Sequence, residues 1–104
     1  MTDMAGGEVI LERRVWERHC VAQHPEVRDF LDRIPGVVSR PNLVIASPTM
    51  DTTIIYYRLG AAEPRYRFLY LAVVVRYDST PARVVTVYLT DSPSGEGRLL
   101  HYAR

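Results

Sequence analysis

The chain contains no lysine, a single cysteine, no glycine-rich phosphate-binding motif and no apolar run long enough to cross a membrane. Because Cys20 is alone, no internal disulfide can form, and we expect a reducing compartment, the cytoplasm. The longest apolar run ends in Arg76 and Asp78, which excludes a spanning helix, and charges follow Gly7 too soon for a signal peptide. No membrane partner is expected.

The missing lysine leaves arginine as the only strongly basic side chain. The net charge is +1, but it is unevenly distributed. Residues 1–57 hold six arginines against eight acids, a net charge of −2, whereas residues 58–104 hold seven arginines against four acids, a net charge of +3. The second half of the chain therefore suits an anionic partner.

The length of 104 residues predicts one domain, with a flexible N-terminus over residues 1–7 and a single α+β domain over residues 8–104. Residues 8–11 fit either a short edge strand or the lead-in to a helix. A first helix is predicted from residue 12 to residue 23. A second begins at Pro25 and ends at Pro35-Gly36, and its apolar stripe consists of Val27, Phe30, Leu31 and Ile34.

Four strands are predicted after the helices: residues 43–47, residues 53–59, a central strand of roughly ten residues within 67–78, and residues 83–90. Short turns between them indicate an antiparallel meander with both helices packed on one face. Alternation assigns to this dry face the side chains of Leu69, Leu71, Val73, Val75, Val85, Val87 and Leu89. Alternation assigns to the opposite face Tyr70, Arg76, Thr86, Tyr88 and Thr90, and we expect Tyr56 and Arg58 to join them.

A face of aromatic rings, guanidinium groups and hydroxyls can stack bases and hold phosphates. The alternative is structural, because tyrosine and threonine are common on any solvent-facing strand. The residues alone leave both interpretations open.

The polar cluster that most strongly suggests a chemical role consists of His19, His24 and Glu26, around the predicted helix junction. Imidazole exchanges protons near neutral pH, so either histidine suits acid–base catalysis, and Glu26 is a spare base. In the structural alternative, His19 packs beside Trp16, His24 merely precedes Pro25 and Glu26 caps a helix. The i, i+5 spacing disfavours a helical metal pair. Cys20 has no evident cation to lower its pKa and is rejected as a nucleophile.

Five short patterns follow one another over residues 8–100: H-x4-H-P-E, R-P-N-x-V, Y-Y-R, V-V-V and V-T-V-Y-x-T-D. In order and spacing they resemble small phage and mobile-element proteins of the barnase–EndoU–colicin–RelE nuclease superfamily. The resemblance implies a toxin-like or phage-encoded endoribonuclease that needs neither metal nor other cofactor. Its expected partners are RNA, a cognate antitoxin or immunity protein, and a second copy in a homodimer.

The resemblance also implies roles for individual residues. His19 or His24 would transfer protons, Arg58 would stabilise the phosphate, and Thr90 would donate a hydrogen bond to it. Apart from the resemblance, the chemistry of the Tyr/Arg-rich face assigns substrate binding to Tyr56, Tyr88 and Arg76. If the first helix covers the dry face, a histidine meets Arg58 only at a sheet edge or across a strongly curved sheet. The alternative function is a non-catalytic binding or regulatory module that acts through the Tyr/Arg-rich face. A small-molecule enzyme is disfavoured by the missing phosphate loop.

Overall fold

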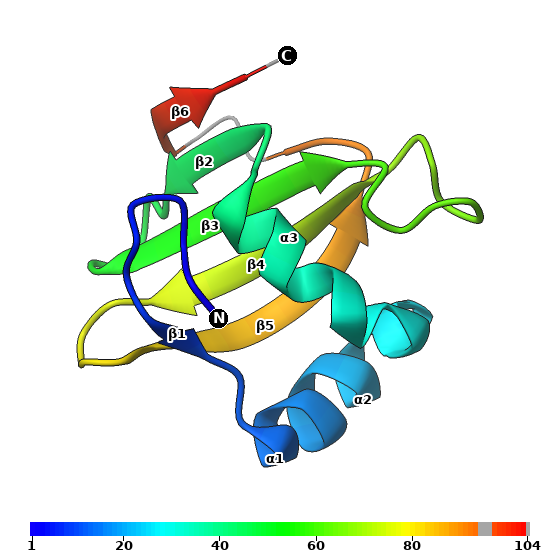
Figure 1. Ribbon diagram of the computed structural model, residues 1–104, viewed down its shortest axis with the longest axis horizontal. Helices are drawn as coiled ribbons and strands as arrows, with labels where there is room; N and C mark the ends of the chain where they lie inside the picture. Colours follow the sequence, from blue (N-terminus) through cyan, green and yellow to red (C-terminus); the bar gives the residue numbers. More distant parts are fainter. Residues whose placement is uncertain (94–96, 104) are drawn as a thin grey trace.

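The computed structural model describes residues 1–93 and 97–103 and has helices packed over one face of a six-stranded sheet (Figure 1). The α+β class is confirmed. The strands are β1 (Val9–Ile10), β2 (Leu43–Ala46), β3 (Thr53–Leu59), β4 (Tyr70–Arg76), β5 (Ala82–Thr90) and β6 (Arg98–Tyr102). They are hydrogen-bonded in the order β1-β5-β4-β3-β2-β6.

The four predicted strands correspond to β2 through β5 and form the expected antiparallel meander. The prediction of a four-stranded antiparallel sheet is nevertheless incomplete. β1 adds to β5 in parallel, and β6 adds to β2 at the other edge, which makes the sheet mixed. The central strand predicted within residues 67–78 is also shorter than expected, because β4 begins only at Tyr70 and Phe68 lies in the loop before it.

The first helical segment runs continuously through α1 (Arg13–Val15), η1 (Trp16–Cys20) and α2 (Val21–Gln23). Its middle turn is π-helical, with the Val21 N–H donating to the carbonyl of Trp16. The second segment comprises the 3₁₀ helix η2 (Pro25–Arg33) and α3 (Ile34–Ser39). No helix among the described residues has the length and apolar character needed to cross a membrane.

The predicted helix end at Pro35-Gly36 is wrong. Pro35 instead occupies one of the first positions of α3, where its missing N–H costs no intrahelical hydrogen bond. The break falls earlier, at Phe30, whose backbone is non-helical. The chain therefore turns before the proline and continues across the sheet as α3 (Figure 1).

The larger core lies between the helices and the sheet face beneath them, which we call the helix face. Strand register places Val44, Tyr56, Val73 and Val87 in one row there, against Trp16, Val27 and Phe30 of the helices. The next row, on the outer face, is Leu43, Tyr57, Ala72 and Tyr88. A second apolar cluster forms around the buried Ile45, Tyr57 and Ala72, so the outer face is partly apolar as well.

A β-bulge interrupts the alternation of β5. Val74 pairs with Thr86 and Val75 with Val84, which leaves Val85 without a partner in the ladder. As a result Val84 is buried in the core and Val85 is only partly buried. The expected dry face is therefore correct for Val87 but wrong for Val85, because one extra residue shifts the phase of the strand.

The N-terminal residues 1–7, which we expect to be flexible from their composition, form a loop centred on the buried Asp3. One carboxylate oxygen accepts the N–H groups of Ala5 and Gly7, at 3.0 and 2.7 Å. The other accepts the hydroxyl of Tyr77 at 2.7 Å, and the hydroxyls of Tyr77 and Tyr56 lie 2.5 Å apart. This chain of hydrogen bonds connects the loop to the end of β4.

Candidate functional site

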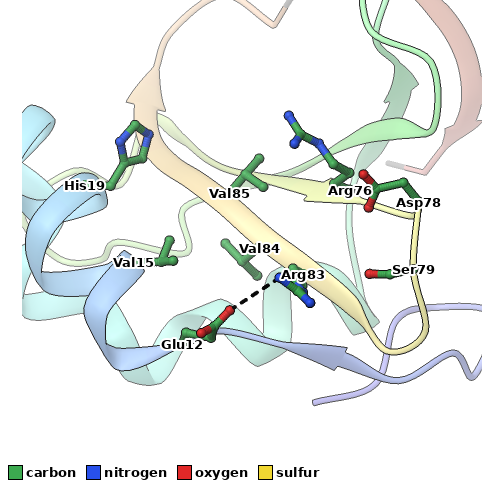
Figure 2. A pocket seen from close by; sticks show the side chains of 9 residues that line it. All are labelled: Glu12, Val15, His19, Arg76, Asp78, Ser79, Arg83, Val84 and Val85. Atoms are coloured by element: carbon green, nitrogen blue, oxygen red, sulfur yellow. Dashed lines mark ion pairs between the residues drawn. The ribbon is translucent and has the colours of Figure 1, made fainter.

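A cavity of about 590 Å³ opens where the first helical segment meets the edge of β5 (Figure 2). We call it the His19 pocket. Its wall comes from the helical segment, the end of β4, the following turn and the start of β5: Glu12, Val15, His19, Arg76, Asp78, Ser79, Arg83, Val84 and Val85. A volume of this size is in the range of small-molecule and substrate sites.

His19 belongs to the π-helical turn η1, a rare geometry that is frequent at functional sites. The neighbouring Trp16 and Cys20 are buried on the core side of this turn, whereas His19 is only half-buried. Figure 2 shows the His19 ring on the helical side of β5, whereas Val85 and the Arg76 guanidinium lie across the strand from it, so the lining of the pocket comes from both sides of this strand. An imidazole and a guanidinium therefore line the same cavity.

Two arginines lie opposite each other on neighbouring strands at this site. Arg76 ends β4 and Arg83 pairs with it from β5, so both project from the outer face. An Arg83 nitrogen lies 3.8 Å from a Glu12 oxygen, but both side chains are about half exposed. Such an exposed pair is weak, and an incoming anion can replace the carboxylate.

The chemistry of the pocket is that of an anion site with a proton-transfer group. Paired guanidinium forks match the oxygens of a phosphate or carboxylate, and imidazole exchanges protons near neutral pH. Asp78 and Ser79, both exposed, add a carboxylate and a hydroxyl at the rim. The arrangement suits a phosphodiester better than a neutral ligand.

The structure does not bring the other predicted catalytic residues to this pocket. Arg58 donates to the Arg40 carbonyl and lines a separate cavity of about 280 Å³ with Asp32, Arg33, Gly36, Gly60 and Ala61. The expected convergence of His19 with Arg58 is therefore absent from the described residues. The reason is register, since Arg58 pairs with Leu71 at the far end of β4 from Arg76.

The side chains of His24 and Thr90 contact residues outside the His19 pocket. The His24 ring lies 5.7 Å from the ring of Tyr88, and its Nδ1 lies 3.9 Å from a Glu26 oxygen. The Thr90 hydroxyl bonds both the N–H and the carbonyl of Ser92, at 3.0 and 3.1 Å, and so organises the turn after β5. Neither lines the His19 pocket.

The expected grouping of Tyr56 with Tyr88 on one face is wrong. Tyr56 is 4% exposed and lies on the helix face, so its ring is not presented to a ligand. Its neighbour Tyr57 takes the outer face instead, edge-on to Tyr70 and hydrogen-bonded to Tyr88. Of the predicted substrate-binding residues, Arg76 alone lines the His19 pocket.

Sequence reasoning missed Arg83, Asp78 and Glu12. The sequence does contain a signal for Arg83. Arg76 and Arg83 flank the turn between two predicted strands, and a hairpin places such residues opposite each other. No comparable signal exists for Glu12, which reaches the site through the packing of the helical segment against the edge of β5.

Burial changes the acidity of several groups around the core. It raises the pKa of the Cys20 thiol, which keeps the thiol protonated and a poor nucleophile. Desolvation also raises the pKa of Tyr77, Tyr56 and Tyr88, with the hydrogen bonds to Asp3 and Tyr56 adding to the rise at Tyr77.

These tyrosines predict a loss of stability in alkali. Unfolded tyrosine ionises near pH 10, whereas the folded phenols hold their protons to higher pH. Their contribution is therefore complete below about pH 10 and is lost as the pH rises through the folded values. We expect the urea midpoint of unfolding to fall as the pH is raised from about 9 to about 11, a range centred on the pKa of unfolded tyrosine. In Tyr77→Phe the midpoint should fall less steeply. An unchanged midpoint over this range would contradict the raised pKa values.

No three His, Cys, Asp or Glu side chains within residues 1–93 and 97–103 are grouped as metal ligands would be. Comparison with family models, with curated proteins and with solved structures gives no match for the chain. The site must therefore be interpreted from its own residues.

Proposed function

We propose that the protein is a metal-independent endoribonuclease whose active site is the His19 pocket. The observation that carries the proposal is that His19, Arg76 and Arg83 line one cavity beside the sheet edge. The proposal keeps the proton-transfer role for His19 and moves the phosphate contact from Arg58 to the two paired arginines. It also accords with the net charge of +3 over residues 58–104.

The reaction follows from these groups. The neutral imidazole of His19 takes the proton of a ribose 2′-hydroxyl, and the 2′-oxygen attacks the adjacent phosphorus. Arg76 and Arg83 hold the nonbridging oxygens, whose negative charge grows in the transition state. The bond to the 5′-oxygen breaks, and water supplies the proton to that oxygen while the imidazolium returns its own to solvent. The products are a 2′,3′-cyclic phosphate and a 5′-hydroxyl.

The test is cleavage of a labelled mixed-sequence RNA by the purified protein in EDTA, with identification of the ends formed. We expect cleavage and cyclic phosphate ends, and no cleavage of the same RNA with its 2′-hydroxyls methylated. Intact unmodified RNA after prolonged incubation at micromolar protein would reject the proposal. In cells, the proposed toxin-like activity acts on cytoplasmic RNA, so induced expression should arrest growth.

The second candidate is a non-catalytic binding module, and the edge strand β6 favours it. Leu99, Leu100 and Tyr102 on this strand are exposed, and the described residues pair with β6 on its β2 side only. An exposed strand edge with apolar side chains is a template for a partner strand, from an inhibitor protein or a second copy. Dimerisation or partner capture without RNA cleavage would support this candidate.

A further inference from the structure

The loop between β3 and β4, residues 60–69, projects away from the sheet at the end remote from β1 (Figure 1). It contains the sequence Arg65-Tyr66-Arg67-Phe68, in which cations and aromatic rings alternate. Phe68 is 81% exposed, the largest exposure among the exposed large apolar side chains of the described residues. Arg65 and Arg67 are exposed as well. An exposed phenylalanine that directly follows two closely spaced arginines is a surface suited to a ligand with both aromatic and anionic groups.

The loop is built as a fixed platform. Gly60, at a φ of +75° that suits glycine, donates its N–H to the carbonyl of Leu69 and so closes the loop. Arg33 donates to the carbonyls of Ala61 and Glu63. Tyr66 packs edge-on against the core residue Phe30, with ring centroids 6.0 Å apart. Phe68 is thus presented to solvent from a well-anchored segment.

Charge and ring geometry indicate the class of ligand. The Arg67 guanidinium lies 5.6 Å from the centroid of the Phe68 ring, and that of Arg65 lies 5.3 Å from the Tyr66 ring. Stacking on an exposed ring beside guanidinium groups is how proteins hold single-stranded nucleic acid without reading its sequence. Arg58 and Arg33 line the adjacent cavity at the base of the loop, where Asp32 lies 3.7 Å from the Arg33 guanidinium and leaves Arg58 as the cation without an acidic partner in that lining.

We propose that the 60–69 loop is a binding site for a single-stranded polynucleotide, with one base stacked on Phe68 and backbone phosphates on Arg65 and Arg67. The site is separate from the His19 pocket, since the two lie at opposite ends of the seven-residue strand β4, whose ends are about 20 Å apart. It goes beyond the proposed cleavage, because it requires binding whether or not the pocket is catalytic.

Fluorescence anisotropy with a labelled 12-nucleotide 2′-O-methyl RNA tests the site, because this probe cannot react through its 2′-oxygen. Phe68→Ala is expected to weaken binding about tenfold, and Phe68→Leu by a similar factor, because stacking on the ring and not apolarity carries the contact. Phe68→Trp should restore the affinity. Arg67→Ala should weaken binding and reduce the salt dependence by about one phosphate contact.

Matched controls are Met50→Ala, an exposed apolar residue in the turn between β2 and β3, and Arg14→Ala, an exposed arginine on α1; both should bind as the parent chain does. A 12-nucleotide DNA of the same sequence distinguishes the source of the ligand: equal binding assigns the loop to single strands in general, and weaker binding assigns it to RNA. Unchanged affinity in Phe68→Ala and Arg67→Ala overturns the proposal. So does an effect of Phe68→Ala on binding to phosphatidylserine vesicles alone, which would make the loop a lipid contact.

Discussion

Replacing His19 by alanine is expected to lower the rate of RNA cleavage at neutral pH by about 10²- to 10⁴-fold, the usual contribution of a general acid or base. The side chain is half-buried at the pocket wall, so the substitution removes the imidazole without opening the core. Single-turnover rates on a labelled RNA in EDTA measure the effect. Thermal unfolding of the same sample verifies that the variant is folded.

Arginine variants decide where the phosphate lies. Arg76→Ala should reduce the rate by about 10²-fold or more, because a lost donor to the transition-state oxyanion has this effect. The matched control for His19→Ala is His101→Ala, because His101 lies on β6 beside Val44 and outside the His19 pocket. If Arg58→Ala abolishes cleavage while Arg76→Ala does not, the active site lies at the other end of β4 and the assignment to the His19 pocket is wrong.

Replacing Asp3 by alanine is expected to lower the free energy of unfolding by about 3 kcal/mol. The carboxylate accepts two backbone N–H groups and the Tyr77 hydroxyl, and buried donors left without an acceptor cost about 1–3 kcal/mol each. Part of this cost is recovered through water, because the loop around Asp3 is exposed. Urea unfolding at pH 7 measures the change.

Glu8→Ala is the matched control for this effect. Glu8 is the acid that directly follows this loop, but its side chain is exposed and forms only a 3.5 Å ion pair with the N-terminal amine. Its loss should change the stability by less than about 1 kcal/mol. Equal effects of the two substitutions would mean that the Asp3 hydrogen bonds do not anchor the loop. Because Tyr77 stands between Arg76 and Asp78, loosening this anchor should also disturb one wall of the His19 pocket.

The sequence predicts the centre of the fold better than its edges. β2 through β5 are adjacent along the chain, carry regular alternation and are joined by short turns, so local rules suffice for them. β1 has only two residues, and β6 pairs with a strand more than fifty positions earlier in the chain. Neither pairing leaves a pattern within a short window of sequence.

The candidate site is partly predictable for a similar reason. His19 and Arg76 are evident as chemically capable residues, but which of them meet depends on strand phase. Tyr56 and Tyr57 are adjacent, and a shift of one position exchanges their faces. The hydrogen bond of Tyr56 to Tyr77, and through it to Asp3, joins residues from three distant parts of the chain. Periodicity carries no information about such contacts.

The extra residue in β5 offers a way to tailor the pocket. Val85 stands outside the ladder and lies on the Arg76 side of β5 in Figure 2. Deleting it leaves Val84 opposite Val75 and Arg83 opposite Arg76, so the core contacts and the paired guanidiniums keep their places. A one-residue deletion, which would invert the faces of a regular strand such as β3, is here a conservative change that widens the space available to a ligand.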